Sequence, residues 1–320
     1  MKKIYIFIFI NLIYLGLKAQ DQPVANQYLL NKFFNNPAFV GSSKEAIIVK
    51  LTDRHQWIGV TDAPYTQTIS AQGRIGKTNG VGFCLYNDKN GANYTRGIQL
   101  AYAYMIRFPK IRFLLKPGDY TEPMISFGLS FNGYQLSLDE REFINYNNDP
   151  LYKGVIQKTF IPNANTGIYF YSPTLYAGLS ANQILPLKVN IYNQEIEPKT
   201  KTYIFANLGV SLGESTTMYN WGFEPSLLFK MDTDKDRQLD INFKVRYART
   251  FWLAASYRRN LDQGGGSNMN AVFLAGVDYH QYRFAYVYDH SLSELRTFSA
   301  GSHEIMIGFL MGKNVLSAKY

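Results

Sequence analysis

The 320-residue sequence is poor in cysteine and in long apolar runs, and each shortage excludes a class of protein. A single cysteine, Cys84, excludes an internal disulfide and the multi-cysteine metal sites. Between Phe83 and Leu85, this cysteine is interpreted as a small buried residue. Beyond the N-terminal segment there is no run of about 18 apolar residues, which excludes membrane-spanning helices.

Positive charge is only mildly in excess. The chain has 33 Lys and Arg against 24 Asp and Glu, a formal net charge of +9. The basic residues are scattered among aromatic segments, so we expect no nucleic-acid partner. Anionic lipid headgroups or an acidic partner would suit this charge. Because no glycine-rich phosphate loop or paired-carboxylate motif occurs, we expect no cofactor.

The N-terminus has the regions of a secretory signal peptide. The basic residues Lys2 and Lys3 precede an apolar run from Ile4 to Leu17, and Ala19 is a small residue before a plausible cut. The run is shorter than the roughly 20 residues that a membrane helix needs. We therefore predict a signal peptide over residues 1–19 and an exported protein.

The sequence is rich in aromatic residues and in segments where apolar and polar residues alternate. The chain has 25 Tyr and 22 Phe, and from Leu239 to Tyr247 apolar residues alternate with Asp240, Asn242, Lys244 and Arg246. Alternation places the two sets on opposite faces of a strand. A membrane β-barrel explains both features, because every second residue of its strands faces lipid.

Fourteen segments show this alternation, and an even number brings both ends of a barrel to the same side. They cover residues 47–55, 65–75, 79–87, 94–108, 123–138, 163–171, 174–184, 201–213, 219–231, 237–248, 250–260, 269–279, 281–290 and 303–312. We predict an all-β fold, a transmembrane antiparallel β-barrel of about 14 strands within residues 47–320, located in the cell outer membrane. The alternative is a soluble two-sheet sandwich, whose apolar faces would point inward.

The links between these segments sort into two lengths. Short links suit periplasmic turns, and they lie at residues 79–80, 172–173, 248–249 and 280. Longer links suit external loops, and they cover residues 138–162, 186–200 and 291–302.

Two local patterns resemble catalytic or metal-binding sites but lack essential features. Residues 232–236 begin like a calcium loop, yet Arg237 and Phe243 stand where glycine and glutamate are required, so a solvated hairpin tip is preferred. Asp289 and Ser291 flank His290, but neighbouring strand residues point to opposite faces and cannot form a triad. The other histidines are single, at His55, His280 and His303. We predict no metal site and no enzymatic activity.

Between the signal peptide and the first predicted strand lies a distinctive segment, residues 27–42. Tyr28, Leu29 and Phe33 have helical spacing, which predicts a short helix ended by Pro37. The motif continues with residues 54–59, Arg-His-Gln-Trp-Ile-Gly, and with the pair Ala63-Pro64.

This succession resembles the PorP/SprF family of the type IX secretion system, found in Bacteroidota. The family pattern runs Gln-Tyr, Asn-Pro-Ala with Gly-Ser, Arg-x-Gln-Trp, and a proline before the second strand. Residues 288–291 and 302–305 also resemble the closing strands of the family. Tyr320 departs from the usual barrel end, because this aromatic residue follows a tail after the last predicted strand.

The resemblance implies a non-enzymatic outer-membrane component that assists export and surface attachment of a cargo, such as an adhesin with a C-terminal sorting domain, and a link to gliding motility. The implied partners are this secreted cargo, periplasmic and outer-membrane secretion components, and the lipid bilayer. The alternative is a passive, porin-like solute channel. The matching motif residues are Gln27, Tyr28, Asn35, Pro37, Gly41, Arg54, Gln56, Trp57 and Pro64.

Two interpretations of these motif residues stay open. In the structural one they supply a helix breaker, a tight turn and a tryptophan at the membrane interface. In the other, the N-terminal segment within residues 20–46 folds into the lumen and plugs a barrel that would otherwise leave an aqueous hole, with the charged inner wall providing hydrogen bonds.

Overall fold

A computed structural model of the chain describes residues 27–42, 47–108, 122–142, 154–189, 199–213, 221–261 and 269–312. The predicted signal peptide, its cleavage site and Tyr320 lie outside these residues. Within the described ranges, no helix is long and apolar enough to cross a membrane.

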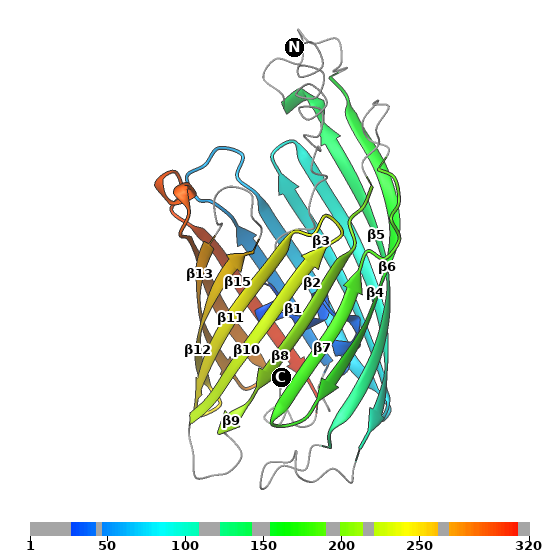
Figure 1. The fold of residues 1–320 in the computed structure, drawn as a ribbon, viewed down its shortest axis with the longest axis vertical. Coiled ribbons are helices and arrows are strands. Elements are labelled where there is room, and N and C mark those ends of the chain that lie inside the picture. Colours follow the sequence, from blue (N-terminus) through cyan, green and yellow to red (C-terminus); the bar gives the residue numbers. More distant parts are fainter. Residues whose placement is uncertain are drawn as a thin grey trace, which may run out of the picture.

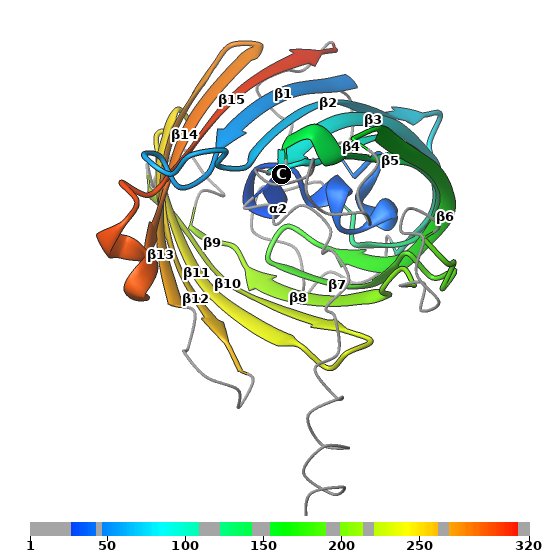
Figure 2. The same ribbon diagram turned by 90° about the horizontal axis from the view of Figure 1, so that it is seen from above.

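The described strands form a closed antiparallel β-barrel (Figures 1 and 2). The ring closes where the last strand pairs with the first, with Ile47 opposite Met311 and His55 opposite His303. Fourteen strands make the ring, and the two-residue β9 is an extra strand that follows β8 and pairs with β10. Their bounds are β1 (Ile47–His55), β2 (Tyr65–Ile75), β3 (Asn79–Asn90), β4 (Asn93–Arg107), β5 (Met124–Asp139), β6 (Ile156–Tyr171), β7 (Leu175–Asn182), β8 (Tyr203–Val210), β9 (Leu212–Gly213), β10 (Trp221–Asp232), β11 (Arg237–Tyr247), β12 (Phe251–Asn260), β13 (Met269–Tyr279), β14 (Tyr282–Ser291) and β15 (Ser302–Met311).

The predicted barrel of about fourteen strands is confirmed, and most strand bounds agree within two residues. The main difference is β6, which begins at Ile156 instead of residue 163. Pro162 hides this extension in the sequence, because proline disfavours a central strand, yet here it pairs opposite Gly133. The external link between β5 and β6 is therefore shorter than predicted and holds the 3-10 helix η4 (Glu140–Glu142).

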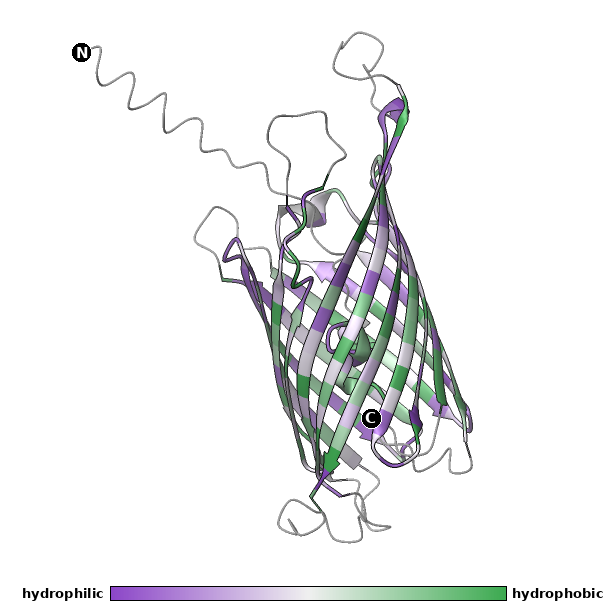
Figure 3. Ribbon diagram, turned by 90° about the vertical axis from the view of Figure 1, so that its right-hand side faces the viewer, coloured by the Kyte–Doolittle hydropathy of each residue, from purple (hydrophilic) through white to green (hydrophobic). Residues whose placement is uncertain are grey.

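The outer and inner faces of the barrel have opposite chemistry. Outward side chains such as Leu253 and Leu129 are 66% and 60% exposed, whereas the inward Asp240 and Glu304 are 0% and 1% exposed. Hydrophobic and hydrophilic residues alternate along the strands (Figure 3). An apolar exterior around a largely polar interior is the arrangement of a membrane barrel, so the soluble sandwich is wrong.

The two ends of the barrel differ in their connections. The end at which β1 begins and β15 ends carries tight turns at residues 76–78, 172–174, 248–250 and 280–281, together with the longer links 108–123 and 211–220. The opposite end carries the longer links 56–64, 140–155, 183–202, 261–268 and 292–301, the last with η6 (Glu294–Thr297), and the short links 91–92 and 233–236. Because short turns of such barrels face the periplasm, we assign the end with more of the tight turns to the periplasm.

Residues 27–42, here called the lumen segment, lie inside the barrel (Figure 2). The segment consists of α2 (Gln27–Leu30), η1 (Lys32–Phe34) and η2 (Pro37–Phe39). The prediction that Pro37 ends a helix is wrong: the helix ends at Leu30, and Pro37 begins η2. Proline suits the first position of a helical turn, because the N–H that it lacks would have no hydrogen-bond partner within the helix at that position.

Candidate functional site

The lumen segment packs against one side of the barrel through an apolar core. Phe33, Phe39 and Val40 are fully or almost fully buried. Their partners lie on β3 to β7, and they are Cys84, Ala101, Ala103, Met105, Met124, Tyr169, Tyr171 and Tyr176. Burial contributes about 1.5–3 kcal/mol for each phenylalanine, so this core is the main source of docking energy.

Two glycines of the inner wall allow the backbone of the segment to approach closely. A Cβ atom built on Gly128 would lie 2.1 Å from the Ala38 amide nitrogen. One built on Gly80 would lie 2.2 Å from the Val40 carbonyl oxygen. Both distances are far below van der Waals contact, so at these two positions the wall can accept the backbone of the segment only because a side chain is missing.

A buried polar cluster fastens the start of the segment to the other side of the barrel. The Tyr28 hydroxyl lies 2.6 Å from an Asp240 carboxylate oxygen and 3.0 Å from the Asn242 side-chain oxygen. Arg258 pairs with the same carboxylate at 3.0 Å. Burial, reinforced by the charge of Asp240, raises the pKa of Tyr28 well above its usual value. Tyr28 therefore stays protonated and donates its hydrogen bond.

Further polar contacts come from strands around the lumen. The Asn31 amide donates to the Ser70 hydroxyl at 2.9 Å, and the Ser180 hydroxyl donates to the Asn35 carbonyl at 2.7 Å. Additional contacts are Arg74 Nε to the Gly41 carbonyl at 2.7 Å, the Asn36 amide to the Ile168 carbonyl at 3.2 Å, Lys32 with Glu224 at 3.6 Å, and Lys50 Nζ to the Leu30 carbonyl. With contacts on opposite walls, the segment is held in one position.

A second group of motif residues lies at the extracellular end, in the link between β1 and β2. The backbone N–H of Gln56 donates to the Pro64 carbonyl at 2.8 Å and closes this link at its base. Trp57 adopts a positive φ of 49° and is 36% exposed. The Ile58 amide donates to the Gly301 carbonyl at 2.9 Å, which joins the link to the one between β14 and β15.

The nine motif residues therefore do not form one site. Arg54 stands apart from both groups, facing the lumen on β1 and pairing with Asp289 at 3.3 Å. The lumen segment carries Gln27, whose side chain is not described, together with Tyr28, Asn35, Pro37 and Gly41; the extracellular link carries Gln56, Trp57 and Pro64.

Several residues that hold the segment were missed in the sequence. They are Lys50, Gly80, Gly128, Asp240 and Arg258. A usable signal was present on the inner face of β4, where Ala101, Ala103 and Met105 replace the polar residues expected against water.

The two rejected chemical patterns have structural roles. Asp232 was predicted to be solvated, but it is buried: its carboxylate accepts the Asp234 and Asp236 amides at 3.0 and 2.9 Å and contacts Lys201 at 3.3 Å. His290 points to the outer face, whereas its neighbours on β14 point inward, so no triad forms. In the part of the chain that the structure describes, no group of three His, Cys, Asp or Glu could hold a metal ion.

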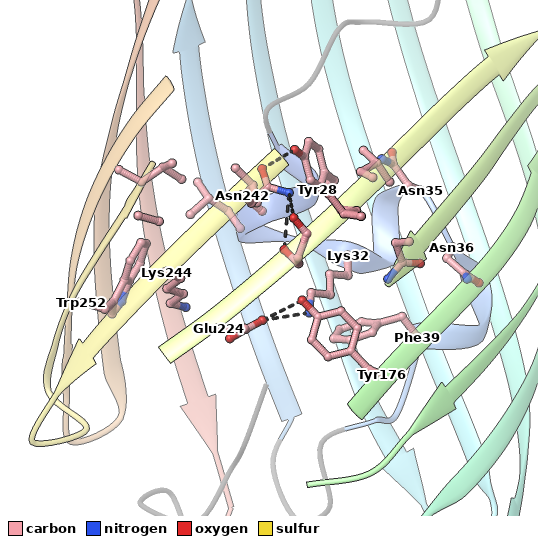
Figure 4. Close-up of a pocket in the computed structure, with 18 of the residues that line it drawn as sticks. Tyr28, Lys32, Asn35, Asn36, Phe39, Tyr176, Glu224, Asn242, Lys244 and Trp252 are labelled. Atoms are coloured by element: carbon pink, nitrogen blue, oxygen red, sulfur yellow. Dashed lines mark hydrogen bonds and ion pairs between the residues drawn. The ribbon is translucent and has the colours of Figure 1, made fainter. Parts of the chain in front are cut away.

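A cavity remains between the lumen segment and the wall made by β10 to β15 (Figure 4). Its volume is about 110 Å³. In Figure 4, Lys244 and Trp252 lie on one side of it, and Tyr176 and Phe39 lie on the other. The segment thus fills one side of the lumen with apolar side chains and leaves a polar-rimmed space on the other.

The solved structures that are similar to this chain include outer-membrane proteins. The CymD monoaromatic hydrocarbon channel has a TM-score of 0.50 at 12% identity, covering 93% of this chain and 95% of that one. The Acinetobacter baumannii outer membrane protein Omp33 has a TM-score of 0.46 at 6% identity, covering 85% of this chain and 100% of that one. A Pseudomonas aeruginosa FadL homologue has a TM-score of 0.46 at 9% identity, covering 87% of this chain and 92% of that one. Of these three, the CymD channel reaches a TM-score of 0.50, and at 12% identity its likeness concerns the fold alone.

Comparison of sequences identifies the family. None of the curated proteins compared with this chain matches it. The family model described as type IX secretion system membrane protein PorP/SprF matches residues 17–309. That match covers the lumen segment and all but the end of the last strand, and the barrel places the protein in the outer membrane. The chain belongs to the PorP/SprF family of type IX secretion system membrane proteins.

Proposed function

We propose that this outer-membrane component of the type IX secretion system assists the export and surface attachment of a secreted cargo, such as an adhesin with a C-terminal sorting domain, without catalysing a reaction. The observation that carries the proposal is the docked lumen segment. Passive channels need a hydrated path through the barrel. Here residues of the segment contact opposite inner walls, which favours a partner-binding barrel over a solute pore.

An apolar patch at the extracellular end supports a partner at that face. Trp57, Ile58 and Val60 are 36–41% exposed, and Phe298 on the adjoining link is 74% exposed. Hydrogen bonds between Ile58 and both Gly301 and Ala300 join the two links into one surface. Exposed clusters of large apolar residues mark interaction sites, and tryptophan is enriched among residues that dominate binding. We infer that the cargo docks on this patch.

Comparing surface proteomes tests the cargo role. In a strain without the gene, one surface protein should be missing or released into the medium while general secretion continues. Normal surface display of every cargo would contradict the proposal.

The patch can be tested separately. The double variant Trp57→Ser, Phe298→Ser should release the same cargo as the deletion strain, while the barrel still assembles. Val155→Ser is the matched control, since Val155 is 46% exposed on the link between β5 and β6 at the same end. Retention of the cargo by the double variant would place the docking surface elsewhere.

A planar-bilayer recording separates this proposal from a porin-like channel. The intact protein should show no steady large conductance, because the lumen segment occupies the path. Deleting residues 20–41 should raise the conductance. A large steady current from the intact protein would favour the channel.

A further inference from the structure

The cavity beside the lumen segment is amphipathic along the barrel axis. Toward the extracellular side, aliphatic side chains form what we call the apolar roof, made of Leu29, Leu228, Leu274 and Met306. Toward the periplasmic end, charged side chains form what we call the cationic rim, made of Lys32, Lys50, Lys244, Arg246, Arg283, Glu224 and Asp278. The order follows from the strands: Lys244 lies three residues from the periplasmic end of β11, whereas Leu274 lies five residues from that end of β13 and Leu228 lies seven from that end of β10.

The cationic rim has an excess of positive charge. Five of its described side chains are cationic and two are carboxylates. Lys32 lies 3.6 Å from Glu224, and Arg283 lies 3.8 Å from Asp278, so each carboxylate is already beside a cation. The positive excess of the rim therefore favours an anion.

Aromatic surface lies beside this charge. Lys244 Nζ is 4.3 Å from the centre of the Trp252 ring, and Trp252 itself lines the cavity. The contact holds the Lys244 ammonium group at the boundary between the rim and the apolar roof. A ligand that touches Lys244 must therefore pass beside Trp252.

We propose that this cavity binds a small monocarboxylate with an apolar body of about four carbons, its carboxylate at the cationic rim and its body under the apolar roof. The size follows from the volume of about 110 Å³, since an engineered apolar cavity of about 150 Å³ holds the six carbons of benzene, and about three quarters of that volume holds about four. A peptide would bring amide groups that the four roof side chains leave without partners, so a short aliphatic acid fits better. This ligand site goes beyond the cargo role and does not depend on it.

Trp252 makes the proposal directly measurable. The chain has three tryptophans, and the other two, Trp57 and Trp221, lie outside the cavity. The variant Trp57→Phe, Trp221→Phe keeps only the cavity tryptophan. In lipid nanodiscs, 3-bromopropionate, whose two methylenes and bromine have about the volume of four carbons, should quench its fluorescence saturably, because bromine quenches on contact. The uncharged 3-bromopropan-1-ol should quench weakly and without saturation.

A rim variant tests the role of charge. In the same background, Lys244→Met should weaken 3-bromopropionate binding about tenfold, the effect of losing one charge-assisted contact. Lys230→Met is the matched control, because Lys230 faces the lumen on β10 but does not line the cavity. It should leave binding unchanged. Circular dichroism and slow migration of the unheated barrel on gels confirm that both variants assemble.

Three results would overturn the proposal. Equal, unsaturable quenching by acid and alcohol would show simple partition into lipid. Saturable quenching that Lys244→Met does not change would show an apolar site without carboxylate recognition. Displacement of the quencher by a short peptide with an aliphatic C-terminal residue, at concentrations where butyrate has no effect, would assign the cavity to a protein terminus.

Discussion

The contact between Gly128 and the lumen segment yields a sharp prediction, that Gly128→Ala undocks the segment. The added Cβ would lie 2.1 Å from the Ala38 nitrogen, 1.3 Å short of the 3.4 Å at which ordinary contact begins. The neighbouring Ala38 Cα and Pro37 carbonyl carbon would lie 2.4 Å away. All three are backbone atoms, so no side-chain rotation relieves the overlap.

The magnitude follows from overpacking. Extra methyl groups in a packed core cost about 1–3 kcal/mol, and a clash with backbone belongs at the upper end. A cost of about 3 kcal/mol shifts the ratio of undocked to docked segment by about 150-fold. The barrel itself should remain folded, because the clash is relieved by displacing the segment.

Single-channel recording is the assay. Gly128→Ala should increase the fraction of time spent in conducting states toward that of the protein lacking residues 20–41. Gly308→Ala is the control, since its added Cβ lies on the inner wall 3.1 Å from the Arg283 Cβ, a tight contact that a shift of a few tenths of an ångström relieves and that does not involve the segment. If deletion opens the barrel but Gly128→Ala behaves like the wild type, the docking geometry is wrong.

Three further predictions follow from the same docking. Because the pKa of Tyr28 is raised in the docked state above its ordinary value of 10.0, docking is fully stable below about pH 10 and weakens as the pH rises further. Conductance should therefore increase above about pH 10, and Tyr28→Phe should remove this dependence. Asp240→Asn leaves Arg258 without its buried carboxylate and should lower the unfolding free energy by about 3–5 kcal/mol, measured by urea unfolding in detergent. Cys84, buried under the segment, should react slowly with a maleimide, and Gly128→Ala should accelerate labelling by about the factor that it changes docking.

The barrel was predictable because its physical cause is local. Lipid on one face and a polar lumen on the other impose a period of two, and β11 shows it without a break. The bounds of a strand were harder to predict where the strand extends beyond the part of the barrel that lies between lipid and lumen. The first part of β6 extends beyond the predicted strand and contains Pro162, so neither periodicity nor propensity marks it.

The position of the lumen segment was predictable only as one of two alternatives. Its motif residues have a helical spacing that the structure realises in a single turn, followed by two 3-10 turns that no periodicity distinguishes. The expected contacts were hydrogen bonds to a charged wall, whereas the larger contact is an apolar core on β3 to β7. Such contacts join residues far apart in the chain, as Tyr28 and Asp240 do, and one sequence carries no signal for them.

The inner wall is divided in a way that connects docking with the proposed ligand site. On β3 to β7, small and apolar residues such as Ala101 and Ala103 accept the segment, and glycines let its backbone approach. On β10 to β15, charged residues such as Lys244 and Arg246 line the remaining cavity. Leu29 and Lys32 of the segment line that cavity too. Undocking would therefore remove part of the apolar roof and of the cationic rim, so Gly128→Ala should weaken 3-bromopropionate binding as well as open the barrel. Unchanged binding in a variant shown to conduct would place the ligand on the strands alone.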